Sequence, residues 1–209
     1  MPGVFIPGFG ASASLYRGLV PSDWDVLEPP SFRASKGALS AYRAWLRAEL
    51  AGRPGPIALG GHSFGAALAV LATTDGDVQV DQLVLVGPAG LPLSKPIRLS
   101  LRDFCAQVAA GLYPLLEAVR LAVRALRAPT SAVRLARTVR RLDIRDELAA
   151  LRRHGIRCTV VAADTDTLTT PAHCRAIAAA AGGDYRELTV DGGHMWFLGD
   201  RRDLHEALR

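Results

Sequence analysis

The chain has 209 residues and a mass of 22.2 kDa, with 49% hydrophobic and 22% charged residues. This length fits a single domain, and the apolar fraction is high enough to bury a core, which excludes a disordered chain. The formal charge is +5, from 25 basic and 20 acidic residues. No apolar stretch reaches the ~18 residues that a transmembrane helix needs.

The N-terminal residues and the cysteines indicate a protein of a reducing compartment. Met1-Pro2-Gly3 leads into an apolar run with no basic segment before it, unlike a secretory signal. Cys105, Cys158 and Cys174 are odd in number and irregularly spaced, which does not fit a disulfide framework. The sequence contains neither CxxC nor HExxH. We therefore expect a cytoplasmic protein without a metal site.

Short apolar runs alternate with longer helical patterns, which predicts an α/β fold with a mostly parallel sheet of about six strands flanked by helices. Most runs are rich in Val, Ile and Leu, as strands buried on both faces should be. The predicted strands are Val4–Ile6, Asp25–Glu28, Ile57–Gly60, Gln82–Val86, Arg157–Ala162 and Arg186–Val190. The predicted helices are Lys36–Ala51, Phe64–Thr73, Asp146–Arg153, Pro171–Ala181 and a C-terminal run from about Asp203.

A long helical stretch interrupts this alternation after the fourth strand. Residues 91–142 carry no strand signal, and Leu99–Arg127 and Thr130–Arg141 both have helical periodicity. A crossover between parallel strands needs only one helix. We therefore expect residues 91–142 to form a helical insertion over one end of the sheet, while residues 1–90 and 143–209 form the core.

The sharpest motif is Gly61-His62-Ser63-Phe64-Gly65, which matches G-x-S-x-G between an apolar run and an alanine-rich helical pattern. A sharp strand-to-helix turn would strain the backbone of Ser63, and the two outer glycines would leave room for neighbouring backbone. The serine would stand at a helix N-terminus, where N–H groups stabilise negative charge. The alternative is an ordinary glycine-rich turn with a surface serine.

A serine hydroxyl needs a base, and His194 is the best placed of the five histidines. It follows the last predicted strand and the turn Asp191-Gly192-Gly193, from which a side chain can reach back across the sheet edge. Within the elbow, His62 is expected to point away from the Ser63 side chain, and His154 is expected to cap a helix. His173 and His205 are expected to be solvated on helices.

The base in turn needs an acid that orients the imidazole. The strand predicted before residue 163 runs into Asp164 and Asp166, on a loop at the C-terminal end of a parallel strand, where sites form in such sheets. We favour Asp166 as this acid and expect Asp164 to hold the turn. Either aspartate could instead cap the helix that follows Pro171.

The order Ser63, Asp166, His194, with the elbow after the third predicted strand, resembles the α/β-hydrolase superfamily. The likeness rests on the elbow motif, the segment ending at Asp166 and the pair Gly193-His194, and it spans nearly the whole core. It implies an α/β-hydrolase fold, a catalytic triad at these three residues, and a helical lid at the insertion after the fourth strand.

The resemblance also implies an oxyanion hole built from backbone N–H groups. One donor should be Phe64, directly after the nucleophile, and the other Phe9, in the loop after the first predicted strand. The sequence departs from the family pattern at Pro7-Gly8, where many relatives have His-Gly, and at Ala163, where many have glycine.

These features together predict a carboxylesterase-like serine hydrolase that cleaves an ester or thioester with an apolar acyl group through an acyl-enzyme. No cofactor is expected. The substrate-binding candidates are Leu112, Tyr113, Leu116 and Trp196.

The predicted insertion is strongly basic, with ten basic residues against Asp103 and Glu117 between Lys95 and Leu142, a net charge of +8. One interpretation is a solvated arginine face whose opposite, apolar face packs over the site. That apolar face would hold Leu112, Tyr113, Leu116, Val119 and Val123. The other interpretation is that the insertion is a docking surface for an acidic carrier protein, a phosphorylated thioester or an anionic membrane. No recognition motif supports nucleic acid.

Two further hypotheses about the function are compatible with the sequence. Gly8-Phe9-Gly10-Ala11-Ser12-Ala13 matches G-x-G-x-x-A after a strand, and Glu28 follows Gly8 by twenty residues, which outlines a dinucleotide-binding oxidoreductase. The other is a non-catalytic protein that binds a small molecule on the same fold, because a fold does not fix a function.

Overall fold

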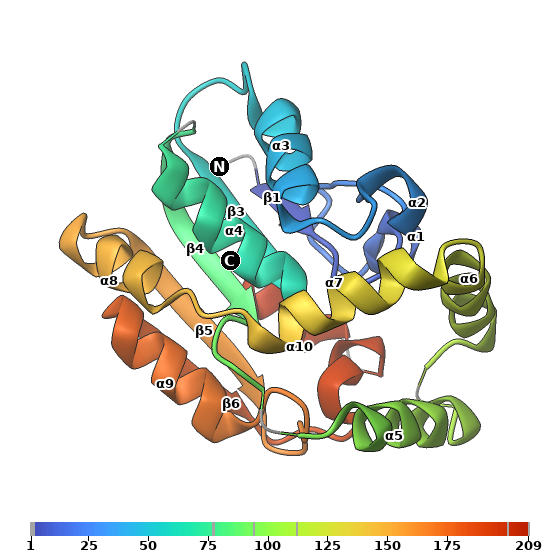
Figure 1. The fold of residues 1–209 in the computed structure, drawn as a ribbon. Coiled ribbons are helices and arrows are strands. Elements are labelled where there is room, and N and C mark those ends of the chain that lie inside the picture. Colours follow the sequence, from blue (N-terminus) through green and yellow to red (C-terminus); the bar gives the residue numbers. More distant parts are fainter. Residues whose placement is uncertain (1–2, 77, 94, 112, 200, 209) are drawn as a thin grey trace.

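The computed structural model of the chain describes residues 3–76, 78–93, 95–111, 113–199 and 201–208. Its centre is a six-stranded parallel sheet in the order β2-β1-β3-β4-β5-β6 (Figure 1). The strands are β1 (Gly3–Ile6), β2 (Trp24–Val26), β3 (Ile57–His62), β4 (Val80–Val86), β5 (Arg157–Ala163) and β6 (Asp184–Leu188). The direction of winding reverses between β1 and β3, so a crevice opens at the carboxyl ends of these two strands.

The predicted α/β class and its six strands are confirmed, with shifted ends. The last strand begins two residues earlier than predicted, at Asp184, and ends at Leu188 instead of Val190. It is an edge strand with mostly exposed or half-buried side chains, so its hydrophobic pattern defines its limits poorly.

Helices cover both faces of the sheet. One face carries α3 (Leu39–Leu50), α4 (Phe64–Asp75), α8 (Arg145–Arg153) and α9 (Pro171–Ala181), as Figure 1 shows. Buried side chains from all four helices share one core with β1, β3, β4 and β5. The second core, on the other face, includes residues from α1 (Ala13–Tyr16), the 3₁₀ segment η1 (Gly193–Leu198) and α10 (Arg201–Ala207).

Three helices are inserted between β4 and α8. They are α5 (Ile97–Ala109), α6 (Leu115–Leu126) and α7 (Pro129–Arg141), and α5 and α6 stand at one side of the sheet (Figure 1). The helical stretch predicted over Leu99–Arg127 is divided into two helices, because Gly111 takes a left-handed φ of 72° and Pro114 directly precedes α6. No helix in the described ranges is both long and apolar enough to cross a membrane.

The helix predicted over Lys36–Ala51 is confirmed but begins three residues later, at Leu39. A short helix, α2 (Phe32–Ser35), ends at Lys36 and Gly37, which both have positive φ, and α3 begins only at Leu39. A Cβ on Gly37 would lie 2.1 Å from the carbonyl oxygen of Ser131, so the chain here passes directly against α7. The two positive φ values and the close packing against α7 thus place the start of α3 after Gly37.

Gly65 allows α4 to approach β1 closely. A Cβ at this position would lie 2.1 Å from Ile6 O and 2.5 Å from Pro7 O. We expect Gly65→Ala to lower the free energy of unfolding by about 3 kcal/mol, because backbone atoms on both sides would have to separate. Gly55→Ala is the control: it meets no atom within 4 Å but keeps a φ of +67°, so it should cost only about 1 kcal/mol. Urea denaturation measures both, and equal losses would contradict the proposed crowding.

Candidate active site

Ser63 lies at the turn between β3 and α4 in the strained conformation that the motif predicts, with φ 54° and ψ −116°. The turn is held by the backbone. The Ser63 N–H donates to Val86 O at 2.9 Å, and the Ser63 carbonyl accepts from the N–H groups of Ala67 and Ala89. Gly61 is needed as well, since a Cβ there would lie 2.5 Å from the carbonyl carbon of Gly65.

His194 and Asp166 are joined by a short hydrogen bond, with 2.7 Å between His194 Nδ1 and Asp166 Oδ2. Asp166 follows β5 and is only 3% exposed. Its Oδ1 accepts from the N–H groups of Leu168 and Thr169, and the Thr169 hydroxyl lies 2.8 Å from Oδ2. The carboxylate is therefore fixed by four donors, and it orients the imidazole of His194.

Asp166 is held in its ionised form. Burial raises the pKa of its carboxyl, but the charge and hydrogen bond of His194, with the bonds from Thr169 and Leu168, outweigh burial and bring the pKa below its ordinary value. A buried anion beside Nδ1 favours the tautomer that leaves Nε2 unprotonated and ready to accept a proton.

A cavity of about 440 Å³ lies beside Ser63 and His194 and is bounded by α5 and α6. Neither the Ser63 hydroxyl nor Nε2 of His194 bonds to another described residue, so both remain available to a bound molecule. The walls are mostly apolar, with Phe9, Leu101, Phe104, Tyr113, Leu121 and Met195 among them.

Two backbone N–H groups near Ser63 have no acceptor in the part of the chain that the structure describes: that of Phe64, the next residue, and that of Phe9, which lines the cavity. Phe64 is the first residue of α4, so its N–H has no acceptor within the helix. The N–H of Phe9, in the loop after β1, likewise has no acceptor among the described residues. Phe9 follows the carboxyl end of β1 and Phe64 follows that of β3, and these two strands are neighbours in the sheet.

A buried chain of hydrogen bonds, which the sequence did not reveal, connects the loop after β1 to His194. The Gly8 N–H donates to the hydroxyl of Tyr16 at 3.2 Å, and this hydroxyl donates to His62 Nδ1 at 2.9 Å. His62 Nε2 donates to the carbonyl oxygen of His194 at 3.1 Å. The rings of His62 and His194 lie 4.6 Å apart. His62 therefore supports the backbone of His194, a role that its place inside the elbow did not indicate.

His62 is neutral in this network. Burial is the main cause, and together with the nearby His194 it holds the pKa of His62 well below its ordinary value. A neutral imidazole has one donor and one acceptor, which is what a hydroxyl on one side and a carbonyl on the other require.

Thr169 and His173 make contacts that the sequence did not predict. Thr169 touches both Asp166 and, at 3.2 Å, His194 Nδ1; the spacing Asp-x-x-Thr in a turn was the available signal. His173 was expected to be solvated, but it is half-buried and its Nε2 donates to Pro88 O at 3.1 Å. Asp164 holds the turn, as expected, by accepting from the Val190 N–H.

The four substrate-binding candidates are placed differently from one another. Tyr113 lines the cavity. Trp196 is 2% exposed within the second core, and Leu116 is 60% exposed on the outside of α6, so the prediction that these two line the site is wrong. Leu112 lies outside the described residues.

The orientation of α6 is opposite to the expected one. Val119 and Val123 were expected to pack over the site but are 49% and 38% exposed. The cavity side is formed instead by Ala118, Leu121, Ala122 and Ala125. Arg124 is not on a solvated face, because it donates to the carbonyl oxygen of Gly10 at 3.1 Å and lies 3.5 Å from Glu28.

The residues on which the dinucleotide-binding hypothesis rests form other interactions in the structure. Glu28 accepts from the Ala13 N–H at 2.8 Å and pairs with Arg124. The helix after the glycines, α1, has only four residues. Within the described ranges, no three His, Cys, Asp or Glu side chains gather as a metal site would require.

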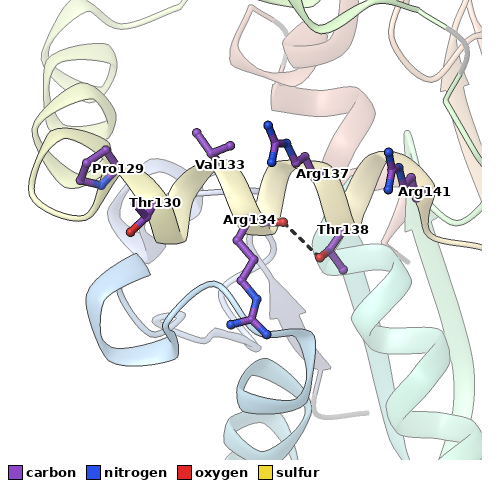
Figure 2. A pocket seen from close by; sticks show the side chains of 7 residues that line it. All are labelled: Pro129, Thr130, Val133, Arg134, Arg137, Thr138 and Arg141. Atoms are coloured by element: carbon purple, nitrogen blue, oxygen red, sulfur yellow. Dashed lines mark hydrogen bonds between the residues drawn. The ribbon is translucent and has the colours of Figure 1, made fainter.

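A second hollow, of about 540 Å³, lies on the outside of α7. Figure 2 shows its side chains, which all come from one helix and include Arg134, Arg137 and Arg141. No residue of the Ser63 cavity lines it.

Comparison with known proteins gives one match by sequence and many by structure. Residues 4–207 match the sequence model of the alpha/beta hydrolase family. The chain is similar to a bromoperoxidase from Bacillus anthracis, with a TM-score of 0.75, 15% identity and coverage of 99% of this chain and 90% of the other. No curated protein sequence matches the chain.

Two other solved structures have the same fold at low identity. A lipase-esterase related protein from Clostridium acetobutylicum ATCC 824 has a TM-score of 0.74 and 13% identity, covering 98% of this chain and 92% of the other. A thioesterase domain from the curacin biosynthetic pathway has a TM-score of 0.64 and 17% identity, covering 99% and 89%. These likenesses establish a fold that is shared by several activities.

Neutral His62 should make stability depend on pH. The unfolded chain takes up a proton on this imidazole below about pH 6.5, whereas the folded chain does not, so the free energy of unfolding falls as the pH decreases from 7 to 5. We expect His62→Gln to reduce this dependence by up to about 1.4 kcal/mol per pH unit. Urea denaturation across this range measures it.

His173, whose pKa is also lowered, mainly by burial, acts in the same direction. His62→Gln should therefore remove part of the slope, and His62→Gln with His173→Gln should remove more. An unchanged slope in His62→Gln would mean that His62 is not held neutral.

Proposed function

Because the chain belongs to the alpha/beta hydrolase family, we propose that it is a serine hydrolase whose catalytic triad is Ser63, His194 and Asp166. One observation carries the proposal. A strained serine at the start of α4 shares an apolar cavity with a histidine whose Nδ1 is bound to a buried, ionised carboxylate. Nucleophilic attack by a hydroxyl requires these three groups, and Ser63 and His194 both face the cavity that would receive the substrate.

In the proposed reaction, Nε2 of His194 takes the proton of Ser63 as Oγ attacks the substrate carbonyl. The negative charge on the carbonyl oxygen is stabilised by the N–H groups of Phe9 and Phe64, each worth about 3 kcal/mol. The imidazolium gives its proton to the leaving alcohol or thiol, which leaves an acyl-enzyme. Water then gives a proton to His194 as it attacks the acyl group, and His194 returns this proton to Ser63 Oγ as the bond to the acyl carbon breaks and the acid is released. Asp166 stays ionised throughout.

We propose that the substrate is a carboxylic ester with an apolar acyl group. The cavity volume of about 440 Å³ falls in the range of small-molecule sites. Its aromatic and aliphatic walls suit an acyl chain, since burial of apolar surface is favourable and few polar partners are offered. Residues 91–142 would act as a lid over this cavity in a protein that we still predict to be cytoplasmic.

A thioester is the second candidate, and the charge of the insertion favours it. The net charge of +8 between Lys95 and Leu142 complements an acidic carrier protein or a phosphorylated thioester. The structural similarity to a thioesterase domain is compatible with this substrate but shows only the fold.

Loss of the nucleophile tests the proposal. We expect Ser63→Ala to reduce hydrolysis of p-nitrophenyl esters by about 10⁴-fold or more, because the residual binding and oxyanion groups cannot replace the attack. The wild type should also show a burst of p-nitrophenol and covalent labelling by a fluorophosphonate. The control is Ser40→Ala on the exposed side of α3, which should leave both signals intact.

Esters from acetate to palmitate and matched thioesters, compared in the same assay, rank the substrate classes by kcat/KM. Activity that survives in Ser63→Ala would remove this serine from the mechanism. A wild type that neither hydrolyses the series nor takes the label would favour the non-catalytic binding protein.

Two neighbouring aspartates offer a matched test of the acid. We expect Asp166→Asn to lower kcat by about 10⁴-fold, because the amide favours the wrong tautomer of His194. Asp164→Asn changes the same charge two residues away, where the side chain only bonds to the Val190 N–H, and should keep most of the activity. Steady-state kinetics at pH 8 measure both, and equal losses would argue against a specific function for Asp166.

A further inference from the structure

The strongly exposed large hydrophobic side chains of the described residues all lie on the inserted helices. They are Leu101, Leu115, Leu116, Val119, Val123, Leu126 and Val133. Five of the seven belong to α6, a helix without a single buried residue. A contiguous group of exposed apolar side chains marks a candidate docking surface.

On α6 these five side chains form one continuous stripe. At about 100° per residue, Leu115, Leu116, Val119, Val123 and Leu126 occupy an arc of about 100° along the whole helix. The side chains of residues 120 and 127, both arginines, project beside this arc. The opposite side of α6 is also apolar and lines the cavity, so the helix has two apolar faces, and only one is covered.

Arginines lie beside this stripe on α6 and on the neighbouring helix α7. Arg127 is exposed, and no described residue forms an ion pair with it. On α7, the next helix, Arg134, Arg137 and Arg141 border the hollow of Figure 2, again without an acidic partner in the described ranges. An apolar stripe next to unpaired arginines is the composition of helices that lie in the plane of an anionic interface.

We propose that the outer face of α6 docks onto an anionic phospholipid surface. The five aliphatic side chains would enter the boundary between headgroups and acyl chains, and the arginines of α6 and α7 would contact lipid phosphates. The stripe contains only Leu and Val. A fluid lipid boundary accepts such side chains without a matching shape, whereas protein interfaces favour aromatic anchors. A second copy of this chain would bring two insertions of +8 together, which charge repulsion opposes.

The helix that carries the docking face also forms part of the cavity wall, through Ala118, Leu121, Ala122 and Ala125. Leu101, on α5, is 62% exposed and lines the same cavity beside Ser63. Docking through α6 would therefore bring the cavity close to the lipid. The lipid binding itself does not depend on catalysis; its use for delivering an apolar substrate rests on the proposed function.

Flotation with vesicles tests the proposal on the whole 209-residue chain. We expect binding to vesicles of phosphatidylglycerol and phosphatidylcholine, weaker binding to pure phosphatidylcholine, and release by salt. Leu115→Gln with Leu126→Gln should lower the partition coefficient by at least about tenfold. Arg127→Glu with Arg137→Glu should lower it about 30-fold, as the loss of two cationic contacts predicts.

The matched charge control is Arg153→Glu with Arg186→Glu, on exposed positions of α8 and β6. It changes the net charge equally and should bind vesicles almost as the wild type does. Circular dichroism and hydrolysis of a short, water-soluble ester establish that each variant folds. Ser63→Ala should bind vesicles like the wild type, which separates this proposal from the proposed chemistry.

Three results would overturn the proposal: a wild type that ignores anionic vesicles, α6 variants that bind as well as the wild type, or a control that loses binding as strongly as Arg127→Glu with Arg137→Glu. Self-association of the wild type that disappears in Leu115→Gln with Leu126→Gln, without vesicle binding, would assign the stripe to a second copy instead. Binding of an acidic protein but not of lipid would assign it to that partner.

Discussion

The close contact between α4 and β1 at Gly65 is the constraint on which the site depends. Because no side chain separates the first turn of α4 from the carbonyl groups of Ile6 and Pro7, the loop after β1 lies directly beside the turn that carries Ser63. Two N–H groups without acceptors, Phe9 and Phe64, are thereby brought to one crevice. The parallel order with β3 next to β1 supplies this crevice.

Polar groups stabilise His194 from two directions in an otherwise apolar interior. Asp166 and Thr169 bind its ring nitrogen, and His62 binds its carbonyl oxygen. Every buried side-chain donor and acceptor in the described residues has a partner, which such a network needs if it is not to cost stability. The histidine is thus positioned through both its side chain and its backbone.

The sequence predicted the sheet and the pairing of Asp166 with His194, because strand patterns and turn residues are local signals. It did not predict Tyr16, which meets His62 across 46 positions of the chain through tertiary packing alone. Periodicity also failed for α6. A helix with apolar residues on two sides gives no indication of which side faces the cavity. In the structure, the side with the smaller residues lines the cavity. These failures share one cause: they depend on contacts between distant segments.

The bond from Arg124 to Gly10 connects α6 with the loop that contains Phe9. Glu117, on the same helix, accepts from the Ser12 hydroxyl in the following residues. Any outward movement of α6 must break these bonds and free the loop that they fix. Through Arg124 and Glu117, the position of α6 and the shape of the loop after β1 are therefore coupled, so a substitution on one of them is felt by the other.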